Sequence, residues 1–147
     1  MTEHMDVDPV ARRRRAQGGK ADQLQTDLQS LDAGVATWAD SFVFGQVWGR
    51  RGISHEERML VAIASLASLG RTAQLRNYLF GAVQDGIPVE KIQEALVMLV
   101  VYAGFPVALA ALTEWRAVLA SSRRHGEVSA ASPGEPGRRA AGEVSGE

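Results

Sequence analysis

The chain has 147 residues, of which 46% are apolar, so it is long enough for one domain with a sizeable hydrophobic core. Its formal net charge of −1 provides no field that would attract nucleic acid or an anionic membrane surface. The absence of cysteine excludes disulfides, thiolate metal sites and cysteine nucleophiles. Because no apolar segment follows the N-terminal arginines, we expect no secretory signal and a cytoplasmic protein.

Both ends of the chain are poor in large apolar residues, which predicts a flexible segment at 1–20 and a disordered tail at 121–147. The first segment contains four consecutive arginines, Arg12, Arg13, Arg14 and Arg15. Without neighbouring aromatic residues, such a run is more typical of a solvated helix start than of a nucleic-acid-binding arm. The second segment buries too little apolar surface to offset the loss of chain entropy. We therefore expect the folded domain at 21–120.

Apolar residues recur with helical spacing between these ends. The first stripe consists of Leu24, Leu28, Leu31 and Val35. A second apolar segment covers 38–48, and Ser54 with Glu57 then forms a capping-box pattern that predicts a helix start. Further helices are predicted at 58–69, 72–84, 88–103 and 106–119. Since the loops are short and no strand pattern occurs, the sequence predicts an all-α, compact antiparallel bundle of about six helices.

The segment 95–112 contains 18 residues without a charge, which is the lower limit for a membrane span. Gly104 and Pro106 interrupt it, and a proline inside a helix costs about 3 kcal/mol. We therefore predict two short buried helices that meet at a turn, with no membrane span. An apolar surface on both helices of so small a protein favours a subunit interface.

Several short motifs between residues 42 and 119 share their order and spacing with one known family. They are Trp48-Gly49-Arg50, Leu69-Gly70-Arg71, Asp85-Gly86-Ile87 and Tyr102-Ala103-Gly104-Phe105-Pro106. In these residues the chain resembles the carboxymuconolactone decarboxylase-like family, and its Trp-Gly-Arg motif resembles the decarboxylase branch. The resemblance implies a homo-oligomer, a trimer or a hexamer, with pockets near the subunit contacts.

The chain departs from this family at the residues that usually carry its chemistry. The peroxidase branch needs a Cys-x-x-Cys motif, which is absent here. The resemblance places Tyr78 where the decarboxylases have a histidine, and a second family histidine would lie near Leu109 or Ala110. The histidines of this chain are His4, His55 and His125. They have no metal-ligand spacing, and we expect His55 to be surface-exposed, so we predict neither a metal site nor a cofactor.

In the absence of the family histidines, the arginine and tyrosine residues beside these motifs are the remaining candidates for catalytic groups. Decarboxylation of a β-keto or vinylogous acid needs a cation for the carboxylate, stabilisation of the enolate and a proton donor. We predict Arg71 and Arg50 as the cations, since arginine holds a carboxylate through two parallel hydrogen bonds, and Tyr78 as the donor. The predicted substrate-binding residues are Trp48, Arg58, Glu94, Tyr102 and Phe105. The alternatives are ion pairs of the arginines with nearby acidic residues, a surface position for Glu94, and core packing of the aromatic residues.

Two classes of function therefore remain open. The first is a cofactor-free decarboxylase-like enzyme for a carbonyl-rich or aromatic acid, with a polyketide-type compound as one candidate. A related enzyme recruited to cyclisation, dehydration or isomerisation in secondary metabolism belongs to the same class. The second is a non-catalytic small-molecule-binding protein or an oligomeric accessory subunit. The retention of Arg50, Arg58 and Arg71 favours the enzyme.

Overall fold

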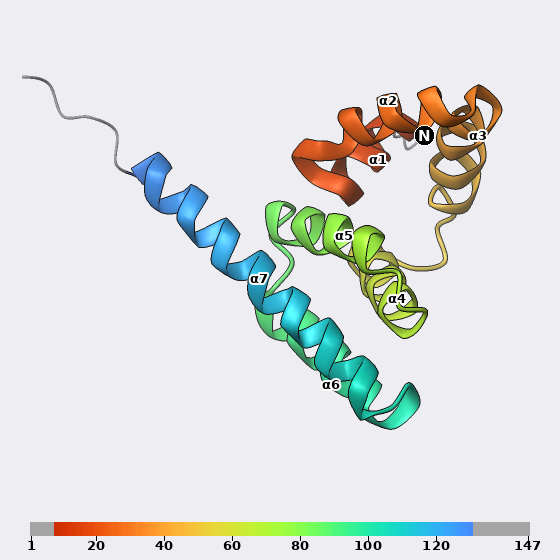
Figure 1. Cartoon of the computed structure of the whole chain (residues 1–147). Coiled ribbons are helices and arrows are strands. Elements are labelled where there is room, and N and C mark those ends of the chain that lie inside the picture. Colours follow the sequence, from red (N-terminus) through yellow and green to blue (C-terminus); the bar gives the residue numbers. More distant parts are fainter. Residues whose placement is uncertain (1–7, 131–147) are drawn as a thin grey trace, which may run out of the picture.

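The computed structural model describes residues 8–130. Every regular element in this range is helical, which confirms the all-α class predicted from the sequence. In chain order the elements are α1 (Pro9–Gln17), the 3₁₀ turn η1 (Gly18–Lys20), α2 (Ala21–Leu31), α3 (Ala33–Trp38), the π-helix η2 (Ala39–Val47), α4 (His55–Ser68), α5 (Thr72–Gln84), α6 (Val89–Tyr102) and α7 (Phe105–Ala130). Helices α6 and α7 form a long hairpin, and the N-terminal helices lie at the opposite end of the molecule from its turn (Figure 1).

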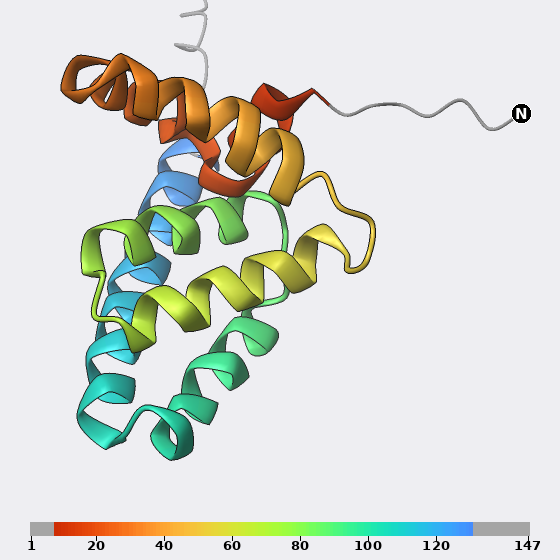
Figure 2. The ribbon, with the colours of Figure 1, turned by 90° about the vertical axis from the view of Figure 1, so that its right-hand side faces the viewer.

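The hydrophobic core lies between α4, α5, α6 and α7. Its largest fully buried side chains are Trp115, Met59, Ile63, Leu79, Ile92, Leu96 and Val118. They come from one face of each of the four helices, at the three- and four-residue spacing on which the sequence prediction rested. Figure 2 shows α4 and α5 side by side, with α7 running behind them.

Helix α4 begins where the capping-box pattern places it. The Ser54 hydroxyl accepts a hydrogen bond from the Glu57 backbone N–H at 3.1 Å. In return the Glu57 carboxylate accepts from the Ser54 backbone N–H at 2.6 Å. This reciprocal pair lowers the pKa of Glu57, because the backbone N–H of Ser54 stabilises the carboxylate.

The uncharged segment 95–112 is divided between two helices, as predicted. Helix α6 ends at Tyr102 and α7 begins at Phe105. Gly104 makes the turn with a φ of +96°, a conformation that favours glycine. None of the helices in residues 8–130 has the length and apolar character needed to cross a membrane.

The N-terminal residues differ from the prediction of a flexible segment. Residues 9–31, here called the N-terminal arm, form α1, η1 and α2 and pack on η2 and α5. Arg13 is buried, with 4% of its surface exposed. It donates to the Asp40 carboxylate at 2.7 Å and to the Ala21 carbonyl at 2.7 Å. Arg13 is therefore a buried tertiary anchor, whereas Arg14 and Arg15 are largely exposed, as expected for a solvated helix start.

Each of the other three arginines also has a partner within the fold. Arg12 donates to the Phe44 carbonyl at 3.1 Å, near the end of η2. Arg14 pairs with Asp22 on the surface, and Arg15 pairs with Asp85 at 2.8 Å. Because Asp85 ends α5, the run connects α1 with elements far along the chain.

Helices α1 and α5 cross in direct backbone contact. A Cβ atom at Gly81 would lie 1.9 Å from the Ala16 carbonyl oxygen, so only glycine fits this position. Ala16 and Gly81 are both buried at the crossing. The crossing fixes how the arm lies against α5.

Helix α7 continues to Ala130, although the sequence predicted a disordered tail from residue 121. The remaining part of the predicted tail, 131–147, lies outside the described residues, as does His4.

Candidate active site

Aromatic rings form a row from η2 to α5 and α4. The Trp48 ring lies 5.4 Å from Phe44, 6.1 Å from Tyr78 and 5.7 Å from His55, measured between ring centroids. These distances are in the range of attractive tilted ring contacts. Trp48 therefore packs directly beside Tyr78, and the fold brings these two candidate residues into contact.

Tyr78 lies in the middle of α5, partly buried against the core. Burial raises the pKa of its hydroxyl above the usual value of 10, and a hydrogen bond with the Gln17 side chain partly opposes this rise. The phenol thus stays protonated at neutral pH. Tyr78 is suited to donate a hydrogen bond or a proton, and it is unsuited to act as a base.

A cavity of about 280 Å³ opens beside Tyr78, between the N-terminal arm, η2 and α5. The polar and aromatic residues of its lining are Arg13, Gln17, Gln25, Asp27, Phe44, Gln74, Asn77 and Tyr78. The leucines of the arm line the same cavity on its α2 side. We call this space the Tyr78 cavity.

Neutral carboxamides dominate the polar lining of the Tyr78 cavity. Gln25 is held in place because its Nε2 donates to the Ala36 carbonyl at 2.9 Å. The Oε1 atom of Gln17 is buried without a hydrogen-bond partner. The one cation in the lining, Arg13, is neutralised by Asp40. The Asp27 carboxylate also lines the cavity and accepts a hydrogen bond from Gln23 Nε2 at 2.7 Å. The cavity therefore offers hydrogen-bond donors and acceptors, and no unpaired cation, to a ligand.

Arg71 lines a different cavity, of about 230 Å³, between α4, α5 and α7. Its walls are mostly apolar and include Leu66, Pro106 and Ala110, with Glu114 at the edge. Glu114 is bound by Arg76 at 2.7 Å. Among the described residues Arg71 has no ion-pair partner. The two family motifs that contain Arg71 and Pro106 therefore line one apolar cavity, in which Arg71 is an available cation.

Arg50 lies in the exposed loop between η2 and α4, and Arg71 lies in the turn between α4 and α5. Figure 2 shows this loop and this turn at opposite ends of α4. Helix α4 separates the two ends by about 20 Å, given its 14 residues and a rise of about 1.5 Å per residue. Arg58 donates to the Arg50 carbonyl oxygen and so fixes this loop. A single chain therefore does not bring Arg50, Arg71 and Tyr78 together.

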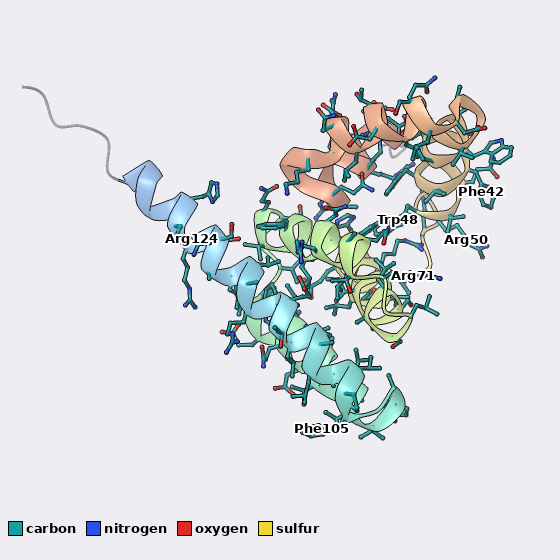
Figure 3. All side chains as sticks on the ribbon, in the orientation of Figure 1. Phe42, Trp48, Arg50, Arg71, Phe105 and Arg124 are labelled. Carbon is teal, nitrogen blue, oxygen red and sulfur yellow. The ribbon has the colours of Figure 1, made fainter. Side chains whose placement is uncertain are left out.

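Three further predicted residues lie on the α6–α7 hairpin, away from Tyr78. Glu94 is exposed on α6. Tyr102 and Phe105 flank the hairpin turn, with 77% and 60% of their surfaces exposed. Figure 3 shows Phe105 at the far end of the hairpin from Trp48. In the single chain Tyr102 and Phe105 belong to an exposed apolar surface, and none of the three residues lines the Tyr78 cavity.

The sequence interpretation of His55 as an exposed residue was wrong. Its side chain is 13% exposed, and its Nε2 lies 3.6 Å from an Asp85 carboxylate oxygen without forming a hydrogen bond. Burial lowers the pKa of His55, and the nearby Arg15 lowers it further. The sequence gives no signal for this contact, because His55 and Asp85 lie far apart in the chain and meet only in the folded protein. Elsewhere in residues 8–130, no three potential metal ligands converge.

The fold and the Tyr78 cavity define a small helical protein with a partly enclosed site for a compact ligand. A sequence model of the carboxymuconolactone decarboxylase family matches residues 33–117, so the chain belongs to this family. One relative is a 4-carboxymuconolactone decarboxylase of Acinetobacter baylyi, 31% identical over 86 residues. These residues span 58% of this chain and 64% of that relative, which is less than two thirds of its length. The family match begins after the N-terminal arm.

Proposed function

We propose that the protein is a cofactor-free, decarboxylase-like enzyme of the cytoplasm that acts on a carbonyl-rich or aromatic small-molecule acid. The observation that carries this proposal is the protonated Tyr78 at the wall of a cavity, in the position where the family resemblance places a histidine. Membership of the family and the similarity to a decarboxylase support the reaction class.

In the proposed reaction, the bond between the substrate carbon and its carboxylate breaks, and the electron pair moves onto the adjacent carbonyl as an enolate. Tyr78 and a cavity carboxamide such as Gln17 donate hydrogen bonds to the enolate oxygen. The proton of Tyr78 then passes to the substrate carbon, and solvent restores the phenol. Carbon dioxide leaves as the second product.

The carboxylate of the substrate needs a cation, and Arg71 and Arg50 remain the proposed candidates. Neither arginine lines the Tyr78 cavity within one chain, so we propose that a neighbouring copy completes the site. Exposed apolar side chains at the end of the α6–α7 hairpin support a homo-oligomer, a trimer or a hexamer; they include Met98, Val101, Tyr102, Phe105 and Leu109. Mass measurement in solution should give a multiple of 15.8 kDa, and a monomer would contradict this proposal.

A second candidate function is favoured by the lining of the Tyr78 cavity, which holds no unpaired cation. Because Arg13 is neutralised by Asp40, the cavity suits a carbonyl compound better than a free carboxylate. This arrangement supports cyclisation, dehydration or isomerisation of a polyketide-type compound in secondary metabolism. A non-catalytic binding role would use the same lining without proton transfer.

The decisive experiment is incubation of the protein with aromatic and lactone acids, followed by mass spectrometry of carbon dioxide and products. We expect Tyr78→Phe to lower turnover of a confirmed substrate by about 100-fold, since a positioned general acid contributes a factor of this order. Arg71→Ala should raise KM, whereas Arg124→Ala, at an exposed position of α7, serves as the matched control. Product without carbon dioxide would support the second candidate, and unchanged turnover in Tyr78→Phe would disprove the site.

A further inference from the structure

Another cavity, of about 490 Å³, lies between η1, the C-terminal half of α5 and the C-terminal part of α7. We call it the η1–α7 cavity. Figure 1 shows α7 passing the end of α5 here and continuing beyond it. Its floor is formed by the partly buried apolar side chains of Phe80 and Val83. Among residues 8–130, Gln17 is the one residue that lines both the η1–α7 cavity and the Tyr78 cavity, and Tyr78 itself does not line the η1–α7 cavity.

A single ammonium group lies above this floor. The Lys20 Nζ is 5.2 Å from the centre of the Phe80 ring, within the range of a cation–π contact. Lys20 makes no ion pair within residues 8–130, and no carboxylate lines the cavity. The charge of Lys20 is therefore available to a ligand that rests on Phe80.

Several of the remaining polar groups of the cavity can donate a hydrogen bond. The Gln84 Oε1 already accepts a hydrogen bond from the Gly19 backbone N–H at 2.7 Å, so its Nε2 is left as a donor. Ser121 and Ser122 add two hydroxyl groups from α7. His125 closes the wall, with its Nδ1 donating to the Ser121 carbonyl at 2.8 Å.

We propose that the η1–α7 cavity is a second ligand site, which binds a small organic anion with a flat apolar body, such as an aromatic carboxylate. The ring would stack on Phe80 and Val83, and the carboxylate would lie between Lys20 and the Gln84 amide. The inference does not depend on the reaction proposed for Tyr78, because it uses a different cavity. The site would bind its ligand whether or not Tyr78 is catalytic.

The test is an NMR titration of the full-length protein with benzoate, and with benzamide as the neutral isostere. We expect benzoate to shift the backbone amide signals of Gln84 and Ser122, and to bind at least about tenfold more tightly than benzamide at low salt. Lys20→Gln should weaken benzoate binding by about tenfold and leave benzamide unchanged. Lys91→Gln is the matched control, because Lys91 is the other lysine of the chain and pairs with Glu56 on the surface.

A second variant tests the contribution of the cavity to binding separately from that of the Lys20 charge. Ser122→Trp places a large ring in the cavity from a half-buried position of α7, and it should abolish the shifts caused by both compounds while the thermal unfolding curve stays unchanged. Equal binding of benzoate and benzamide, or equal benzoate binding by the Lys20→Gln and unsubstituted proteins, would overturn the proposal. So would benzoate shifts confined to the α6–α7 turn, where the exposed apolar residues lie.

Discussion

The N-terminal arm and the α6–α7 hairpin are held in the fold by opposite kinds of contact. The arm is attached through charged and polar groups, chiefly the pairs of Arg13 with Asp40 and Arg15 with Asp85. The hairpin is held by apolar faces, as in the packing of Leu96 with the buried Trp115 in the core. The arm covers a cavity, whereas the hairpin leaves apolar surface exposed at its turn.

This difference shows how one small protein divides its tasks. Hydrogen-bonded ion pairs act at fixed distances and directions, so they place the arm accurately over Tyr78. Apolar packing is less directional, and the same side chains that build the hairpin also provide a surface suited to another copy of the chain. The family match covers the hairpin and α5 and excludes the arm. We therefore expect the arm to set which ligand the Tyr78 cavity accepts.

The largest effect should come from the crossing of the arm with α5. In Gly81→Ala the new Cβ would collide with the Ala16 carbonyl oxygen, and the arm would have to move away. We expect the free energy of unfolding to fall by about 2–3 kcal/mol, the usual cost of severe overpacking. Urea unfolding would measure this loss.

The matched control for this substitution is Gly126→Ala in α7, where no atom lies within 4 Å of the new Cβ. Alanine is the better helix former, so this variant should be as stable as the unsubstituted protein or more stable by up to about 1 kcal/mol. If both variants unfold alike, the arm is not fixed by the backbone contact at Gly81.

A smaller loss is expected from the buried arginine of the arm. Arg13→Ala removes the partner of Asp40 and of the Ala21 carbonyl, and we expect the free energy of unfolding to fall by about 2 kcal/mol. Arg14→Ala, beside it in the sequence, removes only an exposed pair with Asp22 and should have no measurable effect. Equal stability of the two variants in urea would show that the polar attachment of the arm is unimportant.

The smallest expected effect is a pH dependence of stability that arises from His55, where the arm meets α4 and α5. Burial holds the pKa of His55 below its usual value of 6.5, so the unfolded chain binds this proton more tightly than the folded protein does. Stability should therefore be lost as the pH falls below 6.5 and through the folded pKa, and it should be complete above 6.5.

The measurement is the urea midpoint at several pH values for the unsubstituted protein and for His55→Gln. Carboxylates titrate in both proteins, so their difference isolates His55. We expect the midpoint of His55→Gln to fall less steeply below pH 6.5. If the two proteins gave parallel curves, protonation of His55 would not destabilise the folded protein, and the prediction would be wrong.

The sequence alone determined the all-α class, the start of α4 at its capping box and the division of 95–112 at Gly104. These features depend on residues close together in the chain, namely apolar spacing, a capping pair and a turn glycine. It also singled out Trp48 and Tyr78, which the structure brings into ring contact.

Only the tertiary structure decided the roles of the N-terminal arginines, His55 and Gln17. Arg13 is a tertiary anchor because Asp40 lies 27 residues away and reaches it only after η2 packs on α1. His55 is buried because Asp85 and Arg15 come to it from two other elements. Polar side chains carry no periodic signal of burial, and their partners lie far along the chain. Their environment therefore depends on how the helices cross.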